Sequence, residues 1–181
     1  MDDIVKQALT KWPKVPACYG WLGLDARGNW YLRDDKVQAQ GPFSGGSAQS
    51  KGDRLEHSRL IEFICRNYEH DACGQWFFQN GPQRVYVELE ISPYIWHIDP
   101  DLTVRGHTGQ AARVQAAVLD EHGHLYLQTD IGFGLVHSID MGHAVNAIER
   151  GLWLPEQALC AGLPARFGYL LSPQARQLKA T

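Results

Sequence analysis

The chain has 181 residues and a formal net charge of −3, from 17 Lys and Arg against 20 Asp and Glu. A slightly acidic chain without a basic cluster lacks the field that attracts DNA or RNA, so we expect no nucleic-acid partner. A hydrophobic fraction of 44% and a charged fraction of 20% indicate a globular chain, and this length predicts one compact domain over residues 1–181.

The N-terminal segment MDDIVKQALTKW lacks the basic and then apolar order of a secretory signal. No run approaches the roughly 20 apolar residues of a membrane helix, so we expect no membrane association. Four scattered cysteines are too few for a disulfide framework and are expected to remain thiols. These features together predict a cytoplasmic protein.

In chain order, helical spacing of apolar residues first predicts a helix over residues 2–12. Two short β-prone runs, 19–24 and 29–33, are then separated by a turn that contains glycine and predict a hairpin. A Gly- and Ser-rich loop over 34–52 leads to a helix expected from Asp53, over about 54–68, with a pattern like a capping box at its start.

The strongest local pattern is the next hairpin, which we take as the centre of a sheet. Apolar Val85, Val87 and Leu89 alternate with polar or aromatic residues, which is typical of a strand with one buried face. An Asn-Gly turn separates this run from the aromatic segment 76–78 and predicts a hairpin.

The second half of the chain repeats such patterns. A strand over 94–98 and a connector over 103–112 precede a hairpin of 113–119 with 124–128, and a further strand over 131–136.

The C-terminal part is expected to be mostly helical. Ser138 is predicted to cap a helix over 139–150 that Gly151 ends and that buries Met141, Ala144, Val145 and Ile148. A short helix over 155–160, a strand over 166–171 and a helix over 172–179 complete the expected elements. The fold class expected is therefore α+β, a mainly antiparallel sheet with a few helices.

A repeated motif raises the hypothesis of an internal duplication. The pattern L-D-x-x-G-x-x-Y-L occurs at residues 24–32 and again at 119–127. If it marks a duplication, residues 19–34 and 114–129 are equivalent hairpins in two similar halves, 1–100 and 101–181. Common hairpin chemistry is the other explanation, and both are left open here.

The histidines offer the main candidates for chemistry. His137, Asp140 and His143 lie close in sequence at the predicted start of a helix, where they can converge to bind a divalent metal or a ligand, or to hold a histidine that transfers protons. A histidine facing water is the simpler explanation for each. Cys65, His70 and Cys73 do not have the spacing of a zinc motif, so core packing is favoured, and we expect neither a metal nor a cofactor.

The polar face of the central strand is a second candidate. Alternating charge on a strand usually marks the solvated face of an antiparallel sheet. If another element covers that face, Arg84 and Glu88 become candidates for orienting a ligand, because buried charges need partners.

The block GQWFFQNGPQRVYVEL over residues 74–89 resembles a group of uncharacterised proteobacterial proteins that carry W/F-F-Q-N-G-P-Q-R-V-x-V-x-L. The resemblance implies a bacterial origin, and it implies no activity, cofactor or site residues.

No catalytic motif is present, so the first hypothesis is a non-enzymatic protein that binds a partner chain or small ligand, with Arg84, Glu88, His137, Asp140 and His143 as candidate ligand-binding residues. The aromatic content is compatible with a homo-oligomer. The alternative is a small enzyme, metal-assisted or not, that uses histidines and carboxylates in a groove between the halves.

Overall fold

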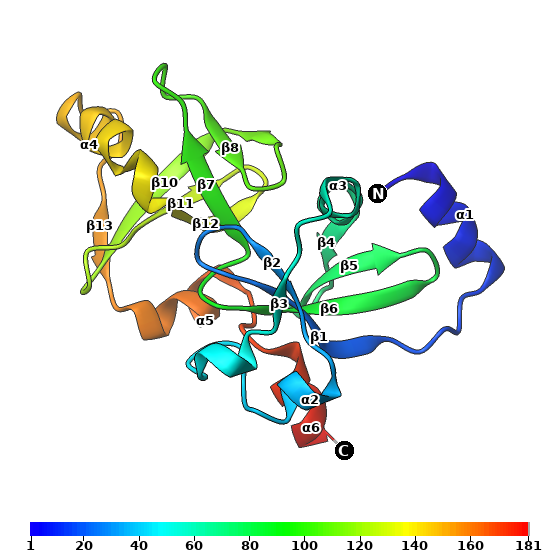
Figure 1. The fold of residues 1–181 in the computed structure, drawn as a ribbon. Coiled ribbons are helices and arrows are strands. Elements are labelled where there is room, and N and C mark those ends of the chain that lie inside the picture. The colour runs from blue at the N-terminus through cyan, green and yellow to red at the C-terminus, as the bar shows by residue number, and fades with distance from the viewer. Residues whose placement is uncertain (181) are drawn as a thin grey trace. The chain divides into compact units, whose positions relative to one another are not determined.

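The computed structural model describes residues 1–180 and has an α+β fold, in which helices accompany two separate mixed β-sheets (Figure 1). The α-helices are α1 (Asp3–Lys11), α2 (Asp35–Gln38), α3 (Ser58–Arg66), α4 (Met141–Glu149), α5 (Leu163–Phe167) and α6 (Pro173–Ala180). Three short 3-10 helices are η1 (Ala48–Ser50), η2 (Ser138–Asp140) and η3 (Cys160–Gly162).

Each sheet belongs to one of two compact units. The first unit comprises Met1–Asp25, Asn29–Ile91 and the chain from Gly168 onward, and the second comprises Ala26–Gly28 and Ser92–Phe167. These bounds differ from halves at 1–100 and 101–181, because the C-terminal segment with α6 groups with the first unit.

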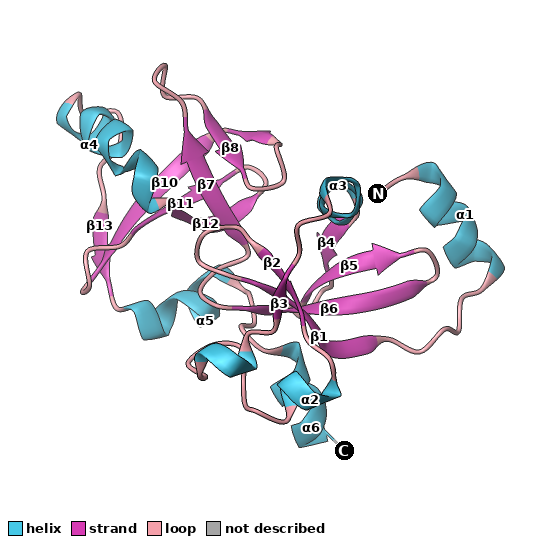
Figure 2. Ribbon diagram, in the orientation of Figure 1, coloured by secondary structure: helices cyan, strands magenta, loops and turns pink. Residues whose placement is uncertain are grey.

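The sheet of the first unit has the strand order β3-β2-β1-β6-β5-β4 (Figure 2). Its strands are β1 (Cys18–Leu24), β2 (Trp30–Leu32), β3 (Asp53–Arg54), β4 (Tyr68–His70), β5 (Trp76–Asn80) and β6 (Gln83–Leu89). Two antiparallel meanders, β1-β2-β3 and β4-β5-β6, are joined where β1 pairs parallel to β6, with Leu22 opposite Val87. The hairpin predicted around the Asn-Gly turn is therefore confirmed.

The sheet of the second unit has the order β13-β10-β11-β12-β7-β8-β9. Its strands are β7 (Tyr94–Ile98), β8 (Val104–Gly106), β9 (Ala111–Ala112), β10 (Val114–Asp120), β11 (Leu125–Thr129), β12 (Gly132–Val136) and β13 (Glu156–Ala158). Again two meanders, β7-β8-β9 and β10-β11-β12, are joined by a parallel pair, here β7 with β12. β13 adds one further strand, parallel to β10.

The two units thus repeat one strand order, but not with the correspondence that the sequence motif suggested. Strand order equates the hairpin β1–β2 with β7–β8, and β4–β5 with β10–β11. Residues 19–34 and 114–129 both form hairpins, yet β1 lies at the parallel junction of its sheet, whereas β10 lies two strands away from such a junction. A common ancestry of the two halves stays a prediction.

The shared motif encodes a turn rather than a position in the sheet. In the turns that follow Asp25, Asp71 and Asp120, the carboxylate accepts a hydrogen bond from the backbone N–H four residues later, at 2.8, 3.0 and 2.8 Å. The glycine three residues after each aspartate has a φ of +73° to +81°, which side chains disfavour. A D-x-x-G turn therefore occurs in three hairpins, so it cannot identify one pair of them.

Several expected elements were wrong in type or extent. The helix expected over 54–68 begins only at Ser58, because Asp53 and Arg54 pair with β2 as β3 and the His57 imidazole accepts the Leu60 N–H as a cap. Its expected end, Tyr68, belongs to β4.

Two further segments also differ. The connector over 103–112 contains β8 and β9, which close a meander onto β7. In place of the helix over 155–160 and the strand over 166–171, the chain forms β13, η3 and α5. The pairing of β13 with β10 joins residues far apart in sequence, so no local pattern could indicate it.

The helix over 139–150 is present as η2 followed by α4, but it buries a narrower face than expected. Ala144 and Ala147 are buried, whereas Val145 is exposed and Met141 and Ile148 are half-buried.

The central strand β6 is covered on both faces over its second half. Val87 and Leu89 are fully buried as expected, but Tyr86 and Glu88 on the opposite face are buried as well. Helix α6 contributes to this cover, since the Gln174 N–H donates to the Glu88 carboxylate at 3.0 Å.

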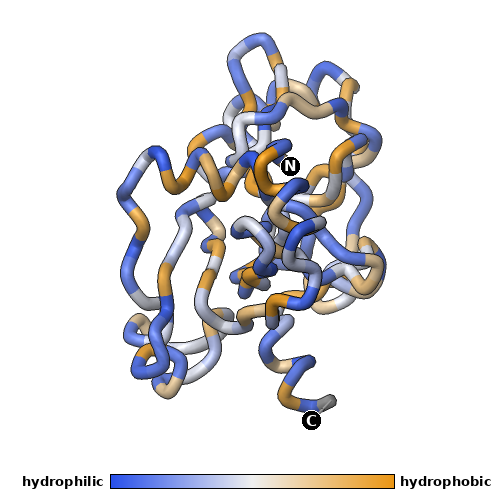
Figure 3. The backbone as a smooth tube through the Cα atoms, turned by 90° about the vertical axis from the view of Figure 1, so that its right-hand side faces the viewer, coloured by the Kyte–Doolittle hydropathy of each residue, from blue (hydrophilic) through white to orange (hydrophobic). Residues whose placement is uncertain are grey.

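Hydrophobic and hydrophilic residues alternate in short stretches along the chain (Figure 3). Over residues 1–180, none of the helices combines the length and the apolar character needed to cross a membrane.

Candidate functional site

His97, His137 and Asp140 form the imidazole–carboxylate cluster of the second unit. His97 lies on β7, His137 directly follows β12, and Asp140 ends η2. Because β7 and β12 pair in parallel, with Val136 opposite Trp96, the residues that follow this pair are neighbours. The His137 N–H donates to the Trp96 carbonyl at 2.8 Å and holds the two histidine-bearing segments together.

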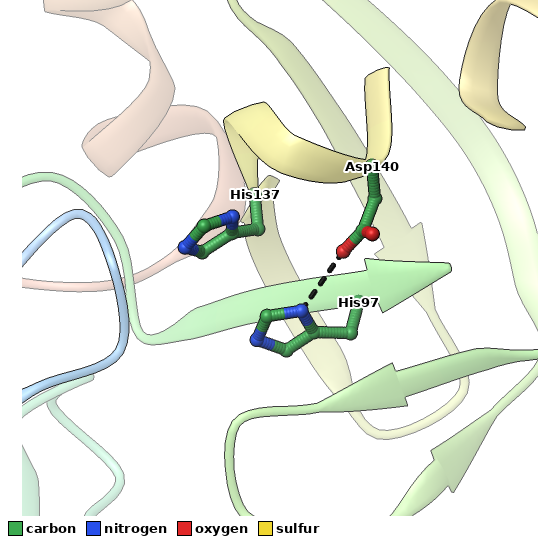
Figure 4. Close-up of side chains that lie close together, drawn as sticks. All are labelled: His97, His137 and Asp140. Carbon is green, nitrogen blue, oxygen red and sulfur yellow. Dashed lines mark hydrogen bonds and ion pairs between the residues drawn. The ribbon is translucent and has the colours of Figure 1, made fainter. Parts of the chain in front are cut away.

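The side chains of the cluster contact one another directly (Figure 4). His97 Nδ1 lies 2.8 Å from Asp140 Oδ2, and the His97 and His137 rings stack with centroids 4.8 Å apart and an angle of 26° between their planes. One potential ligand atom from each residue lies within 4.8 Å of the other two. All three residues are half-buried, so the cluster is open to a ligand from solution.

The hydrogen bonds define which nitrogen of each ring carries a proton. An ionised carboxylate only accepts, so Nδ1 of His97 is the donor of this hydrogen bond and Nε2 is the ring nitrogen left to hold a lone pair. The His137 ring accepts the Ile139 N–H at Nδ1, at 3.1 Å. The cluster therefore combines an oriented basic nitrogen with a second imidazole stacked against it.

The structure brings together only two of the three residues expected at this helix start. His143 is half-buried on α4 and does not belong to the cluster. The expectation assumed one continuous α-helix from residue 139, but a 3-10 turn over Ser138–Asp140 precedes α4 and directs Asp140 toward His97. The sequence did not indicate that His97 belongs with these residues. Its position beside Asp140 depends on the parallel pairing of β7 with β12, which no local sequence pattern shows.

Arg84 and Glu88 do not form a joint site. Arg84 is exposed, with its guanidinium 4.5 Å from the centroid of the Phe77 ring. Glu88 is buried, and desolvation raises the pKa of its carboxyl, although hydrogen bonds from Ser172 and Gln174 and the charge of Arg33 act in the opposite direction. Glu88 thus anchors the start of α6.

Cys65, His70 and Cys73 do not make up a metal-ligand group among the residues that the structure describes. Core packing does not account for all three either, because Cys65 is half-buried but His70 and Cys73 are exposed. A different group has the geometry of a metal site. It consists of Glu121, His122 and Cys160, whose ligand atoms lie within 4.8 Å of one another. The hydrogen bond from the thiol to the Glu121 carboxylate raises the pKa of Cys160.

A cavity of about 630 Å³ lies elsewhere in the second unit. It is bounded by β9, by the first residues of β8 and β10, and by Leu152 and Trp153, with Arg113 and Asp130 as its charged residues. None of the candidate ligand-binding residues expected from the sequence lines it.

Comparisons with known proteins identify a family but no activity. Residues 1–174 match the DUF2944 family model, whose description reads "Protein of unknown function (DUF2946)". No curated protein matches.

Two solved structures are similar to this chain. A DUF1285 family protein from Silicibacter pomeroyi DSS-3 has a TM-score of 0.50 at 10% identity, covering 81% of this chain and 84% of its own. A DUF1285 family protein from Shewanella baltica OS155 has a TM-score of 0.46 at 15% identity, covering 70% and 91%. At 10% identity, the similarity to the Silicibacter pomeroyi protein concerns the fold alone. With a TM-score below 0.5, the Shewanella baltica protein supports no further conclusion.

Proposed function

The chain belongs to the DUF2944 family, whose description assigns no function, and we propose that it binds a small polar ligand at the imidazole–carboxylate cluster. The observation that carries this proposal is the 2.8 Å hydrogen bond between His97 and Asp140. It fixes the orientation of the ring and its tautomer, so that Nε2 presents a lone pair without any reorganisation on binding.

The ligand chemistry follows from that lone pair. A neutral His97 accepts a hydrogen bond from a hydroxyl or amine group, and the stacked His137 ring offers a flat face beside it. Because the cluster is half-buried and none of its residues lines the 630 Å³ cavity, the ligand is expected to be small and only partly enclosed.

Ligand-observed NMR with a library of small alcohols and amines tests the proposal. We expect compounds that bind the wild type and His143→Ala with equal affinity and bind His97→Ala at least tenfold more weakly. His143 is the matched control, since it is a half-buried histidine of the same unit outside the cluster. A library without any binder dependent on His97 would overturn the proposal.

A second candidate is a small enzyme in which the cluster holds a divalent metal. It is favoured by the two neighbouring histidines, because imidazole nitrogens suit zinc, iron or copper. In such a site His97 can ligate through Nε2 while Asp140 keeps its hydrogen bond to Nδ1 and orients the ring.

Nitrogen NMR of the histidine rings separates the two candidates. Stoichiometric Zn²⁺ that shifts the ring nitrogens of both His97 and His137 supports the metal site. Rings that keep their shifts at excess Zn²⁺ would count against it and leave the organic ligand as the better proposal.

The setting of the protein is also part of the proposal. We place it in the bacterial cytoplasm, and the observation in support is that the four cysteines are thiols rather than disulfides. A partner chain, including a second copy of this chain, is proposed as well, whereas a nucleic-acid partner is disfavoured by the net charge of −3.

A further inference from the structure

The turn between β10 and β11 meets η3 at a group of three different ligand types: Glu121, His122 and Cys160. This group, the turn–thiol group, shares no residue with the imidazole–carboxylate cluster. Glu121 Oε1 lies 3.2 Å from the Cys160 thiol sulfur and 3.6 Å from His122 Nε2. We propose that the turn–thiol group is a site for a thiophilic divalent metal ion of the zinc class.

The spacing of the ligand atoms supports this assignment. Usual zinc bond lengths in a tetrahedral arrangement place a thiolate sulfur roughly 3.6 Å and an imidazole nitrogen roughly 3.4 Å from a carboxylate oxygen. The observed separations of 3.2 and 3.6 Å therefore need adjustments of a few tenths of an ångström only. For comparison, the 2.8 Å between His97 and Asp140 is too short for a metal between those two atoms.

The backbone around the ligands is held in place before any metal binds. The buried Asp120 carboxylate accepts the N–H groups of His122 and His124, at 2.9 and 2.8 Å, which orders the turn. On the other side, the Cys160 N–H donates to Glu121 Oε2 at 2.7 Å and ties η3 to the same turn. The backbone therefore loses little conformational entropy on binding.

The charges and protons balance without a redox step. On binding, the Cys160 S–H bond breaks, its proton passes to solvent, and a sulfur–metal bond forms in place of the hydrogen bond to Glu121. A thiolate and a carboxylate then neutralise the two positive charges of the ion. His122 supplies the third protein ligand, and water fills the fourth position of an open site.

Co²⁺ is the probe for the test, because its thiolate charge-transfer band reports sulfur ligation directly. We expect the full-length protein to show this band at one equivalent of Co²⁺, together with the intense visible bands of a tetrahedral ion. Excess Zn²⁺ should abolish both. The imidazole–carboxylate cluster contains no sulfur, so Co²⁺ bound there would not produce the thiolate band. The test of the turn–thiol group is therefore independent of the proposed function.

Matched variants locate the site. Cys160→Ser keeps a hydrogen-bond donor to Glu121 but should lose the charge-transfer band, and His122→Asn should bind Co²⁺ at least tenfold more weakly. Cys73→Ser, which removes an exposed thiol elsewhere, should behave as wild type. A band that persists in Cys160→Ser, or the absence of any band in the wild type, would overturn the proposal.

Discussion

At the scale of single residues, Asp120 organises its hairpin through an unusually complete set of hydrogen bonds. Its side chain is fully buried and accepts from two backbone N–H groups, from the His124 ring and from the Tyr126 hydroxyl. Burial raises the pKa of this carboxyl, but the hydrogen bonds from His124, His122 and Tyr126 outweigh it and leave the pKa below its ordinary value.

Removing this carboxylate should be costly. We expect Asp120→Ala to lower the free energy of unfolding by about 3 kcal/mol, because it leaves four donors without their acceptor, among them the buried Tyr126 hydroxyl. Because the folded pKa is depressed, the contribution of Asp120 is present above the unfolded-state pKa and is lost as pH falls through the folded pKa. Urea unfolding from pH 7 to pH 3 measures both effects, with exposed Glu149→Ala as a near-neutral control.

Glu88 should show the opposite dependence on pH. Its pKa is raised by burial, so the folded state holds the proton more tightly than the unfolded chain. Stability is then greatest below the unfolded-state pKa of about 4.3 and declines as pH rises through the folded pKa. In urea unfolding from pH 4 to pH 8, the wild type should lose stability relative to Glu88→Gln. Identical slopes for the two proteins would contradict this prediction.

At the scale of elements, strand β12 needs glycine where it pairs with β7. Gly132 and Gly134 both lie within β12. A Cβ atom at Gly134 would lie 2.3 Å from the Tyr94 carbonyl oxygen and 2.7 Å from the Trp96 ring nitrogen. Glycine therefore permits the close parallel pairing that positions the imidazole–carboxylate cluster.

We expect Gly134→Ala to lower the free energy of unfolding by about 3 kcal/mol, since the backbone contact cannot relax by a change of rotamer. The matched control is Gly142→Ala on α4, where a Cβ meets open space and alanine favours the helix. Thermal unfolding of both variants measures the difference. A Gly134→Ala variant as stable as the wild type would show that the two strands can separate without penalty.

At the scale of the whole molecule, exposed large apolar side chains occur in both units, and those of the second unit all lie in the segment 139–159. Ile139, Val145, Leu152, Leu154 and Leu159 are exposed, and Leu154 is 81% accessible. Such side chains commonly mark a surface for association. The homo-oligomer expected from composition stays a prediction, and this segment is where we expect its interface.

Sedimentation analysis of Leu154→Glu tests this expectation. Burial of one leucine contributes about 2 kcal/mol, so its replacement by a charged residue should weaken a dimer more than tenfold. Ile4→Glu, at an exposed apolar position of the first unit, is the control and should leave the association unchanged. A wild type that remains monomeric at millimolar concentration would refute the prediction.

The sequence by itself determined the elements whose signals are local. The hairpin around the Asn-Gly turn, the helix near the N-terminus and the D-x-x-G turns follow from alternation, helical spacing and turn chemistry within a few residues. His137 and Asp140 could also be singled out locally, because they flank the start of a helix. His97 could not be joined to them in this way.

Only the tertiary structure decided the rest, because it depends on pairing between distant segments. The parallel pair of β7 and β12 brings His97 to Asp140, and the meeting of a turn with η3 brings Cys160 to Glu121 and His122. Likewise, cover by α6 turned Glu88 from an expected surface residue into a buried one. Contacts of this kind depend on how whole helices and strands pack together. A short stretch of sequence does not predict that packing.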